Sequence, residues 1–177
     1  TTPLVAIDVA IDREADHIDL GAVAVSFGEL TVTKTTLGFR RVKTGGSETL
    51  GVEDVVCPPQ RIETTGLWLT LGQPLRELLA RHECDPHAAL HAVEHALCGA
   101  LPLVAMCDPS DVRGASTPLH DDLAEPALFI FDQYPGGIGL AERGYEAIEA
   151  ILHHARDVVC ACGCAAGCPA CIQSPFC

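Results

Sequence analysis

The chain has 177 residues, of which 48% are hydrophobic and 20% are charged, a composition typical of a compact globular protein rather than a disordered segment. Its formal net charge of −13 argues against broad, autonomous binding to nucleic acid, because phosphates would be repelled over most of the surface. The N-terminus is acidic where a secretory signal needs a basic start, and no apolar run approaches about 18 residues. We therefore expect a cytoplasmic protein with no membrane partner.

The first part of the chain is predicted to form strands, because it is rich in β-branched and aromatic residues. The predicted strands are LVAIDVAI (4–11), LGAVAVSFG (20–28), ELTVTKTTLGFRRV (29–42) and IETTGLWLTL (62–71). In the last of these, Leu67, Leu69 and Leu71 alternate onto one face, and Trp68 is expected to be a core residue. The stretch 43–60 has turn composition, which predicts an exposed loop.

Helices follow the strands. Pro74 opens a predicted helix over 73–83, and a second helix is predicted with Asp85 as its N-cap, Pro86 as its first residue and Gly99 near its end. A stretch containing Pro, Ser and Gly then leads to ALFIFD (127–132), which has the composition of a buried strand. The last predicted helix follows YPGGIGL and has an apolar face formed by Ala141, Tyr145, Ile148 and Leu152.

These elements predict the α+β fold class, with a largely antiparallel or mixed sheet packed by helices and a C-terminal loop built on four cysteines. No linker divides the chain, so residues 1–177 are expected to form a single domain. Within it, we distinguish a strand-rich half (1–72), a helical half (73–159) and a zinc-binding loop (160–177).

A dense group of cysteines ends the chain: six of the ten lie between residues 160 and 177. Pairs two residues apart cannot easily reach disulfide geometry, so a secreted disulfide framework is a poor fit. Four thiols with short spacings can instead surround one metal ion, and Gly163 and Gly167 permit the turns that this requires. The predicted ligands are Cys162, Cys164, Cys168 and Cys171. Four thiolates suit structural Zn²⁺, and an iron–sulfur cluster is the alternative.

The remaining cysteines are left outside this set. Cys160 could compete with Cys162 for the first ligand position, and Cys177 is the last residue of the chain. The scattered cysteines are expected to be small buried hydrophobic residues. They are Cys57, Cys84, Cys98 and Cys107.

Three segments in this order carry a family resemblance: HAVEHALCGALPLVAMCD, ALFIFDQYPGGIGLAERGYEAI and CGCAAGCPACIQSPFC. Together they resemble the C-terminal zinc-binding (MZB, DUF1998-type) domain of the MrfA/SftH-like superfamily 2 DNA helicases. The resemblance covers roughly residues 87 to 177 well and the strand-rich half loosely. It implies the same four cysteine ligands, and a parent protein that translocates 3′ to 5′ on single-stranded DNA with ATP and acts in DNA repair.

The motor of such a helicase is not found in this sequence, which has neither a G-x-x-x-x-G-K-[ST] loop nor an acidic box of the Walker B type. We expect a C-terminal piece whose partners are the helicase motor domains of the same parent chain and, through the parent enzyme, single-stranded DNA. ATP binding is expected in the parent chain only. No residue of this piece is assigned a catalytic role, and it is expected to have no activity alone.

The sequence HAVEH matches the H-x-x-E-H pattern of inverted zinc proteases, with His91 and His95 as ligands and Glu94 as general base. On a helical wheel these residues lie opposite Leu90 and Val93, so the favoured interpretation is a polar helix face. A free-standing metal-dependent hydrolase centred on these three residues remains an alternative function. An iron–sulfur or redox domain using the cysteine cluster is another.

Two further motifs are candidate anion sites. YPGGIGLAER could hold a phosphate at a helix N-terminus, but a strand-to-helix turn that uses Gly136 and Gly137 is favoured. FRRVK concentrates positive charge at Arg40, Arg41 and Lys43, which are the candidate nucleic-acid contacts. The same charges could equally be a solvated strand face.

Overall fold

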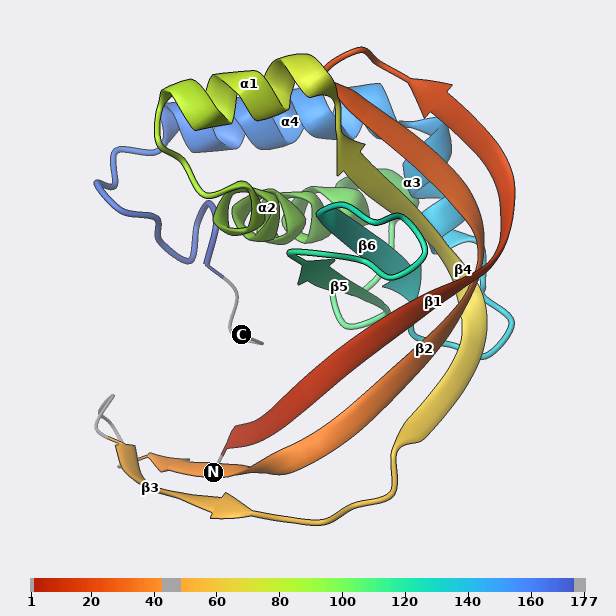
Figure 1. Ribbon diagram of the computed structural model, residues 1–177, viewed down its shortest axis with the longest axis vertical. Coiled ribbons are helices and arrows are strands. Elements are labelled where there is room, and N and C mark those ends of the chain that lie inside the picture. Colours follow the sequence, from red (N-terminus) through yellow and green to blue (C-terminus); the bar gives the residue numbers. More distant parts are fainter. Residues whose placement is uncertain (1, 43–48, 174–177) are drawn as a thin grey trace.

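The chain folds into a six-stranded antiparallel sheet with helices packed against it, and the computed structural model describes residues 2–42 and 49–173 (Figure 1). The strand order is β1-β2-β4-β6-β5, and β3 pairs with the part of β2 that β4 does not reach. All pairings are antiparallel, so the predicted α+β class is confirmed. The strands are β1 (Thr2–Asp19), β2 (Val23–Val42), β3 (Thr49–Asp54), β4 (Gln60–Leu71), β5 (Val112–Thr117) and β6 (Ala127–Asp132).

The helices lie within the arc of the two longest strands, β1 and β2 (Figure 1). They are α1 (Gln73–Arg81), α2 (Pro86–Ala105), α3 (Leu140–Glu146) and α4 (Ile148–Ala161). The predicted N-cap of α2 is confirmed, because the Asp85 carboxylate accepts a hydrogen bond from the His87 N–H at 2.9 Å. The predicted end at Gly99 is wrong. Buried Ala100 and Leu101 pack in the core, and this packing carries the helix on through Pro102 to Ala105.

β2 is one strand of 20 residues, whereas the sequence analysis divided it after Gly28. An alanine at Gly28 would collide with the carbonyl oxygen of Arg13 on β1, where the pairing of the two strands shifts register. The glycine therefore allows a close approach of two backbones at a β-bulge rather than a turn.

Two short strands lie in segments for which no strand was predicted. β3 forms within the stretch 43–60, and β5 forms within the Pro/Ser/Gly-containing stretch before β6. Neither segment alternates polar and apolar residues strongly. Both become strands because a neighbour offers unpaired backbone groups: β2 pairs with β3, and β6 pairs with β5.

The middle of the sheet, at β4 and β6, is buried on both faces. Leu67, Leu69 and Leu71 of β4 pack with α2, α3 and α4 on one face, which confirms the predicted alternation. Trp68 points to the opposite face, where it is 1% exposed and packs with Phe129 and Phe131 of β6. Its predicted place in the core is confirmed.

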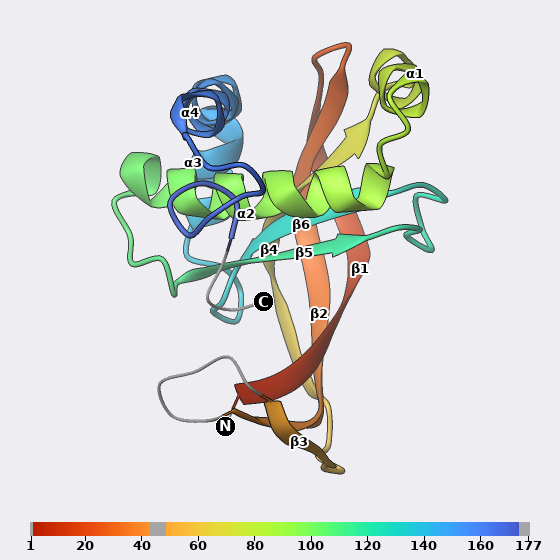
Figure 2. The same cartoon turned by 90° about the vertical axis from the view of Figure 1, so that its left-hand side faces the viewer.

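α2 is the central helix of the helical layer, and in the described part of the chain it is the one helix long and apolar enough to cross a membrane by length and composition. It lies across β5 and β6 (Figure 2) and also contacts α3 and α4. Leu90, Leu97 and Leu101 are each at most 2% exposed in this packing. The apolar composition of α2 is therefore accounted for by its place in the core of this domain.

Candidate metal centre

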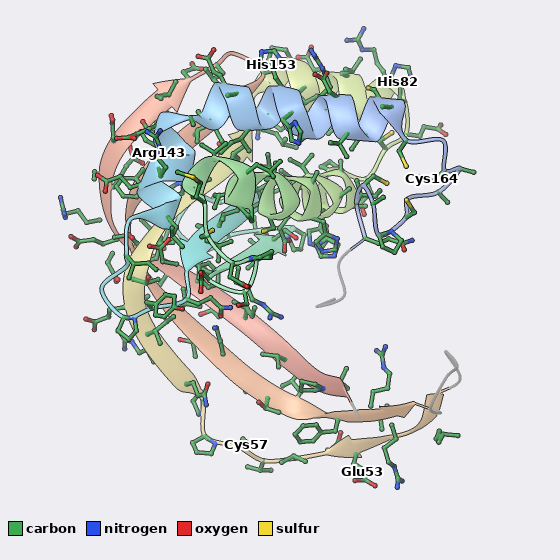
Figure 3. The ribbon with its side chains drawn as sticks, turned by 180° about the vertical axis from the view of Figure 1, so that it is seen from behind. Glu53, Cys57, His82, Arg143, His153 and Cys164 are labelled. Carbon is green, nitrogen blue, oxygen red and sulfur yellow. The ribbon has the colours of Figure 1, made fainter. Side chains whose placement is uncertain are left out.

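The metal centre is built on the loop that follows α4, which we call the cysteine loop (residues 162–173). α4 ends at Ala161, and Cys162 is its C-cap residue. The loop lies beside α2 (Figure 2), and Cys164 in Figure 3 marks its position. It is tied to α2 by a hydrogen bond of 2.7 Å between the ring Nδ1 of His95 and the carbonyl oxygen of Ile172.

Four sulfur atoms converge in this loop. The Sγ atoms of the predicted ligand cysteines all lie within 4.8 Å of one another. The separation is 3.5 Å between Cys162 and Cys168, 3.5 Å between Cys164 and Cys171, and 3.8 Å between Cys168 and Cys171. The short spacings along the sequence have thus been converted into one compact group.

These separations can be compared with what one zinc ion requires. With Zn–S bonds of about 2.3 Å in a tetrahedron, neighbouring sulfur atoms lie about 3.8 Å apart. The observed separations of 3.5 to 3.8 Å are close to that value. A cluster of several iron atoms holds its thiolates further apart than a single ion does. The geometry fits zinc and disfavours the iron–sulfur alternative.

The backbone of the cysteine loop is folded by a turn around Cys168. Its carbonyl oxygen accepts hydrogen bonds from the N–H groups of Cys171, Ile172 and Gln173, at 3.0 to 3.2 Å. Its N–H points at the Cys171 sulfur, at 3.3 Å. Gly167 has φ of 85°, which agrees with its predicted role in the turn. Gly163 is not among the described residues with positive φ.

The four thiols do not release their protons equally. A hydrogen bond from the Cys168 backbone N–H lowers the pKa of Cys171 to about 7. Hydrogen bonding to Cys162 and Cys171 raises the pKa of Cys164 to about 12. A bound cation would lower the pKa of Cys164 again, because a metal stabilises thiolates and displaces their protons. Cys171 therefore becomes a thiolate at lower pH than Cys164, and Cys164 depends more on the metal than Cys171 does.

The other cysteines lie outside the four-sulfur group. Cys160 is exposed near the end of α4, and Cys177 lies outside the described residues. Cys98 packs against the core, and burial raises the pKa of its thiol to about 12, as expected of a small buried hydrophobic residue. Cys84 is exposed, so the same expectation is wrong for it. It follows α1 in a short loop, where no core surface reaches it.

A second group of possible ligands lies on α2. His91, Glu94 and His95 each offer a ligand atom within 4.8 Å of the others. The predicted polar face is wrong in one respect, because Glu94 is buried with 6% exposure whereas Val93 is 38% exposed. β5 covers the side of α2 that carries Glu94, and a helical wheel drawn from the sequence cannot show this.

The glycine-rich turn before α3 does not leave N–H groups free for a phosphate. The carboxylate of Asp132, which is fully buried, accepts hydrogen bonds from the N–H groups of Ile138, Leu140 and Ala141 at 2.6 to 3.2 Å. The chain thus supplies its own anion to this helix N-terminus. Gly136 and Gly137 have φ of 80° and 73°, which supports the favoured interpretation as a turn.

The candidate nucleic-acid contacts lie at the far end of β2, away from the cysteine loop. Arg41 is exposed and forms an ion pair with Glu53 of β3 at 2.9 Å, and Arg40 is exposed as well. Lys43 lies outside the described residues. Figure 3 shows Glu53 on this extended part of the sheet and Cys164 at the other side of the molecule. The two predicted sites are therefore not brought together.

Fold and loop geometry together define an α+β domain with a four-cysteine metal centre at its C-terminal end. The sequence profile described as the MrfA Zn-binding domain matches residues 93–172. The uncharacterized protein MJ1572.1 of Methanocaldococcus jannaschii is 37% identical over 93 residues, which are 50% of this chain and 81% of that protein. The chain belongs to the family of MrfA Zn-binding domains, and zinc is its cofactor.

Longer proteins contain similar domains. The uncharacterized ATP-dependent helicase YprA of Bacillus subtilis is 28% identical over 84% of this chain and 20% of the helicase. The ATP-dependent helicase HRQ1 of Saccharomyces cerevisiae is 26% identical over 88% of this chain and 15% of the helicase. The chain can be superimposed on a crystal structure of the DUF1998 helicase MrfA bound to DNA with a TM-score of 0.70 and 25% sequence identity. The match covers 98% of this chain and 23% of the MrfA chain. The chain thus spans a fifth or less of these curated helicases.

Sequence reasoning missed the structural roles of two residues in this part of the molecule. His95 docks the cysteine loop through Ile172, and no spacing rule predicts a contact between residues 77 positions apart. Asp132 occupies the N-terminus of α3. Asp132 lies eight positions before the first residue of α3, and an acidic residue shortly before a glycine-rich helix start was a signal that could have identified it.

Proposed function

We propose that this chain is the structural-zinc accessory domain of an ATP-dependent 3′–5′ DNA helicase or translocase that acts in DNA repair, with the ATPase core outside these residues. Residues 1–177 would act as one unit. The observation that carries the proposal is the convergence of four cysteine sulfurs at the spacing of a single zinc ion, in a member of the MrfA Zn-binding family. The proposed ligands are Cys162, Cys164, Cys168 and Cys171.

Zinc would act here by ordering the loop. Most residues of the cysteine loop are exposed or partly exposed, so the loop buries little apolar surface of its own. For small structural sites the metal contributes about 10–16 kcal/mol of apparent binding free energy at neutral pH, and this becomes folding free energy. Four protein ligands close the coordination shell, which suits a structural rather than a catalytic ion.

The proposed partners are the helicase motor domains of the same parent chain, with single-stranded DNA reached through the parent enzyme in the cytoplasm. Support comes from the matched helicases, which are several times longer than this chain, and from MrfA, which has been crystallised with DNA. The net charge of −13 favours contact with DNA at a small basic patch only. Arg40, Arg41 and Lys43 are the proposed patch.

Elemental analysis of the purified chain tests the metal site. We expect about one zinc per chain in the wild type when the second site proposed below is kept empty by a weak chelator, and a loss of this zinc in Cys168→Ser. Cys84→Ser is the matched control, because Cys84 is exposed and lies outside the four-sulfur group. Zinc that persists in Cys168→Ser, or iron in its place, would contradict the assignment.

The helicase function is tested in the full-length parent protein. We expect ATP-dependent unwinding of a duplex with a 3′ single-stranded tail, little unwinding of one with a 5′ tail, and reduced activity in the Cys168→Ser parent. Equal unwinding of both substrates would refute the polarity. A parent-gene deletion that leaves cells as resistant to DNA damage as the wild type would refute the role in repair.

A further inference from the structure

The structure holds a second cluster of metal-binding groups that the cysteine centre does not use. His91, Glu94 and His95 lie at positions i, i+3 and i+4 of α2, so their side chains share one face of the helix. Their ligand atoms lie within 4.8 Å of one another. We propose that these three residues bind a second divalent transition-metal ion, of the Zn²⁺ type, at an open three-ligand site.

The burial of Glu94 is the first observation behind this proposal. Its side chain is only 9% exposed, and Gly114 of β5 leaves the space that it occupies. A Cβ at Gly114 would lie 2.6 Å from Oε1 of Glu94 and 2.8 Å from its Cδ. A carboxylate taken out of water is costly unless it is paired or coordinates a metal. Among the described residues, Glu94 is paired with His91, whose Nδ1 lies 3.0 Å from Oε2 of Glu94.

The orientation of His95 is the second observation. Its Nδ1 lies 2.7 Å from the carbonyl oxygen of Ile172, and a carbonyl can only accept, so Nδ1 carries the proton. In the neutral ring, Nε2 then presents its lone pair. Metal-binding histidines commonly donate their other ring N–H to a carbonyl or carboxylate in this way, which fixes the tautomer and the ring orientation.

His91 completes the set. Its Nδ1 lies 3.0 Å from Glu94 Oε2 and 3.0 Å from the Ser116 hydroxyl oxygen, and its ring centroid is 4.4 Å from that of His95. A metal ion at the position of the proton between Nδ1 and Oε2 would reach both atoms with small side-chain rotations. The His91 side chain is 40% exposed, so an ion can enter from solvent. Three protein ligands leave further coordination positions for water.

The donor set decides the class of ion. Two imidazoles and one carboxylate suit Zn²⁺, Fe²⁺ and Co²⁺, whereas the cysteine loop supplies sulfur only. The two sites can therefore be distinguished by spectroscopy. The second site does not depend on the helicase assignment, and failure of one proposal would leave the other intact.

The test uses the chain with its cysteine loop already filled by zinc, to which Co²⁺ is added. We expect visible d–d absorption that saturates at one Co²⁺ per chain, without the intense near-ultraviolet band of thiolate-bound cobalt. Absorption that does not saturate, or that carries the thiolate band, would overturn the proposal.

Variants assign the ligands. Outer partners of metal-binding residues typically contribute about 10–100-fold in affinity, and loss of a ligand should cost at least as much, so we expect Glu94→Gln to weaken Co²⁺ binding by at least about 100-fold. His153→Ala is the control, because His153 is exposed on α4 outside the cluster. Retained zinc in the cysteine loop reports that a variant is folded. If Glu94→Gln unfolds, His91→Asn is the second variant, because His91 is partly exposed and its replacement should leave the fold intact. Unchanged Co²⁺ affinity in His91→Asn would refute the site.

Discussion

The space opposite Glu94 gives a sharp stability prediction, because Gly114→Ala should destabilise the domain. The new Cβ would lie within 2.8 Å of the Glu94 Cδ and Oε1, closer than non-bonded atoms approach. Overpacking a core in this way costs about 1–3 kcal/mol. For a domain of this size, each kcal/mol lowers the midpoint of thermal unfolding by about 2–4 °C. We therefore expect the midpoint to fall by about 2–12 °C.

Thermal unfolding of the zinc-loaded chain, followed by circular dichroism, measures this shift. Gly99→Ala is the matched control, because a Cβ at this position of α2 meets no atom within 4 Å. Alanine is the better helix former, so this change should stabilise the chain by up to about 1 kcal/mol. In a Glu94→Ala background the clash is removed, and Gly114→Ala should then cost little. An equal cost in both backgrounds would refute the steric reasoning.

Other features of the structure give further predictions. Asp132→Ala should lower the free energy of unfolding by about 3 kcal/mol or more in a denaturant titration, because three backbone N–H groups lose their acceptor, and Asp132→Asn should cost less. In the zinc-free chain at neutral pH, iodoacetamide should modify Cys171 well before Cys164, as peptide mass spectrometry can measure, since thiolates react and their pKa values are about 7 and 12. Below pH 7 both rates should fall together, so the preference should narrow only as pH rises above 7, and equal rates at neutral pH would contradict it. Cys168→Ser should weaken Co²⁺ binding at the second site by about tenfold, because the Ile172 carbonyl that orients His95 lies in the cysteine loop.

Local sequence rules predicted the elements whose pattern is set within the chain segment itself. The alternation of Leu67, Leu69 and Leu71 gave the buried face of β4, and Asp85 with Pro86 gave the start of α2. The cysteine spacing predicted a group of four sulfurs, which the structure brings together. In these cases the residues that decide the conformation are neighbours in sequence.

The errors occurred where a distant segment decides the conformation. Gly28 was read as a strand end, but its lack of a side chain admits the backbone of β1. β3 and β5 have little intrinsic strand pattern and form because β2 and β6 have free edges beside them. The helical pattern of α2 placed Glu94 on a polar face, whereas β5 covers it in the structure. Strand pairing and helix burial are tertiary effects, which a single sequence does not report.

The position of the cysteine loop explains how a small metal site can influence a whole domain. The loop has few buried residues, so its conformation depends on the metal and on its contact with α2. That contact is made by His95, whose neighbour Glu94 is fitted against Gly114 of β5. On its other side α2 packs into the core with β4 and β6. Metal binding at the end of the chain is thereby connected to the sheet through one helix, and loss of zinc should loosen the packing of α2 as well as the loop.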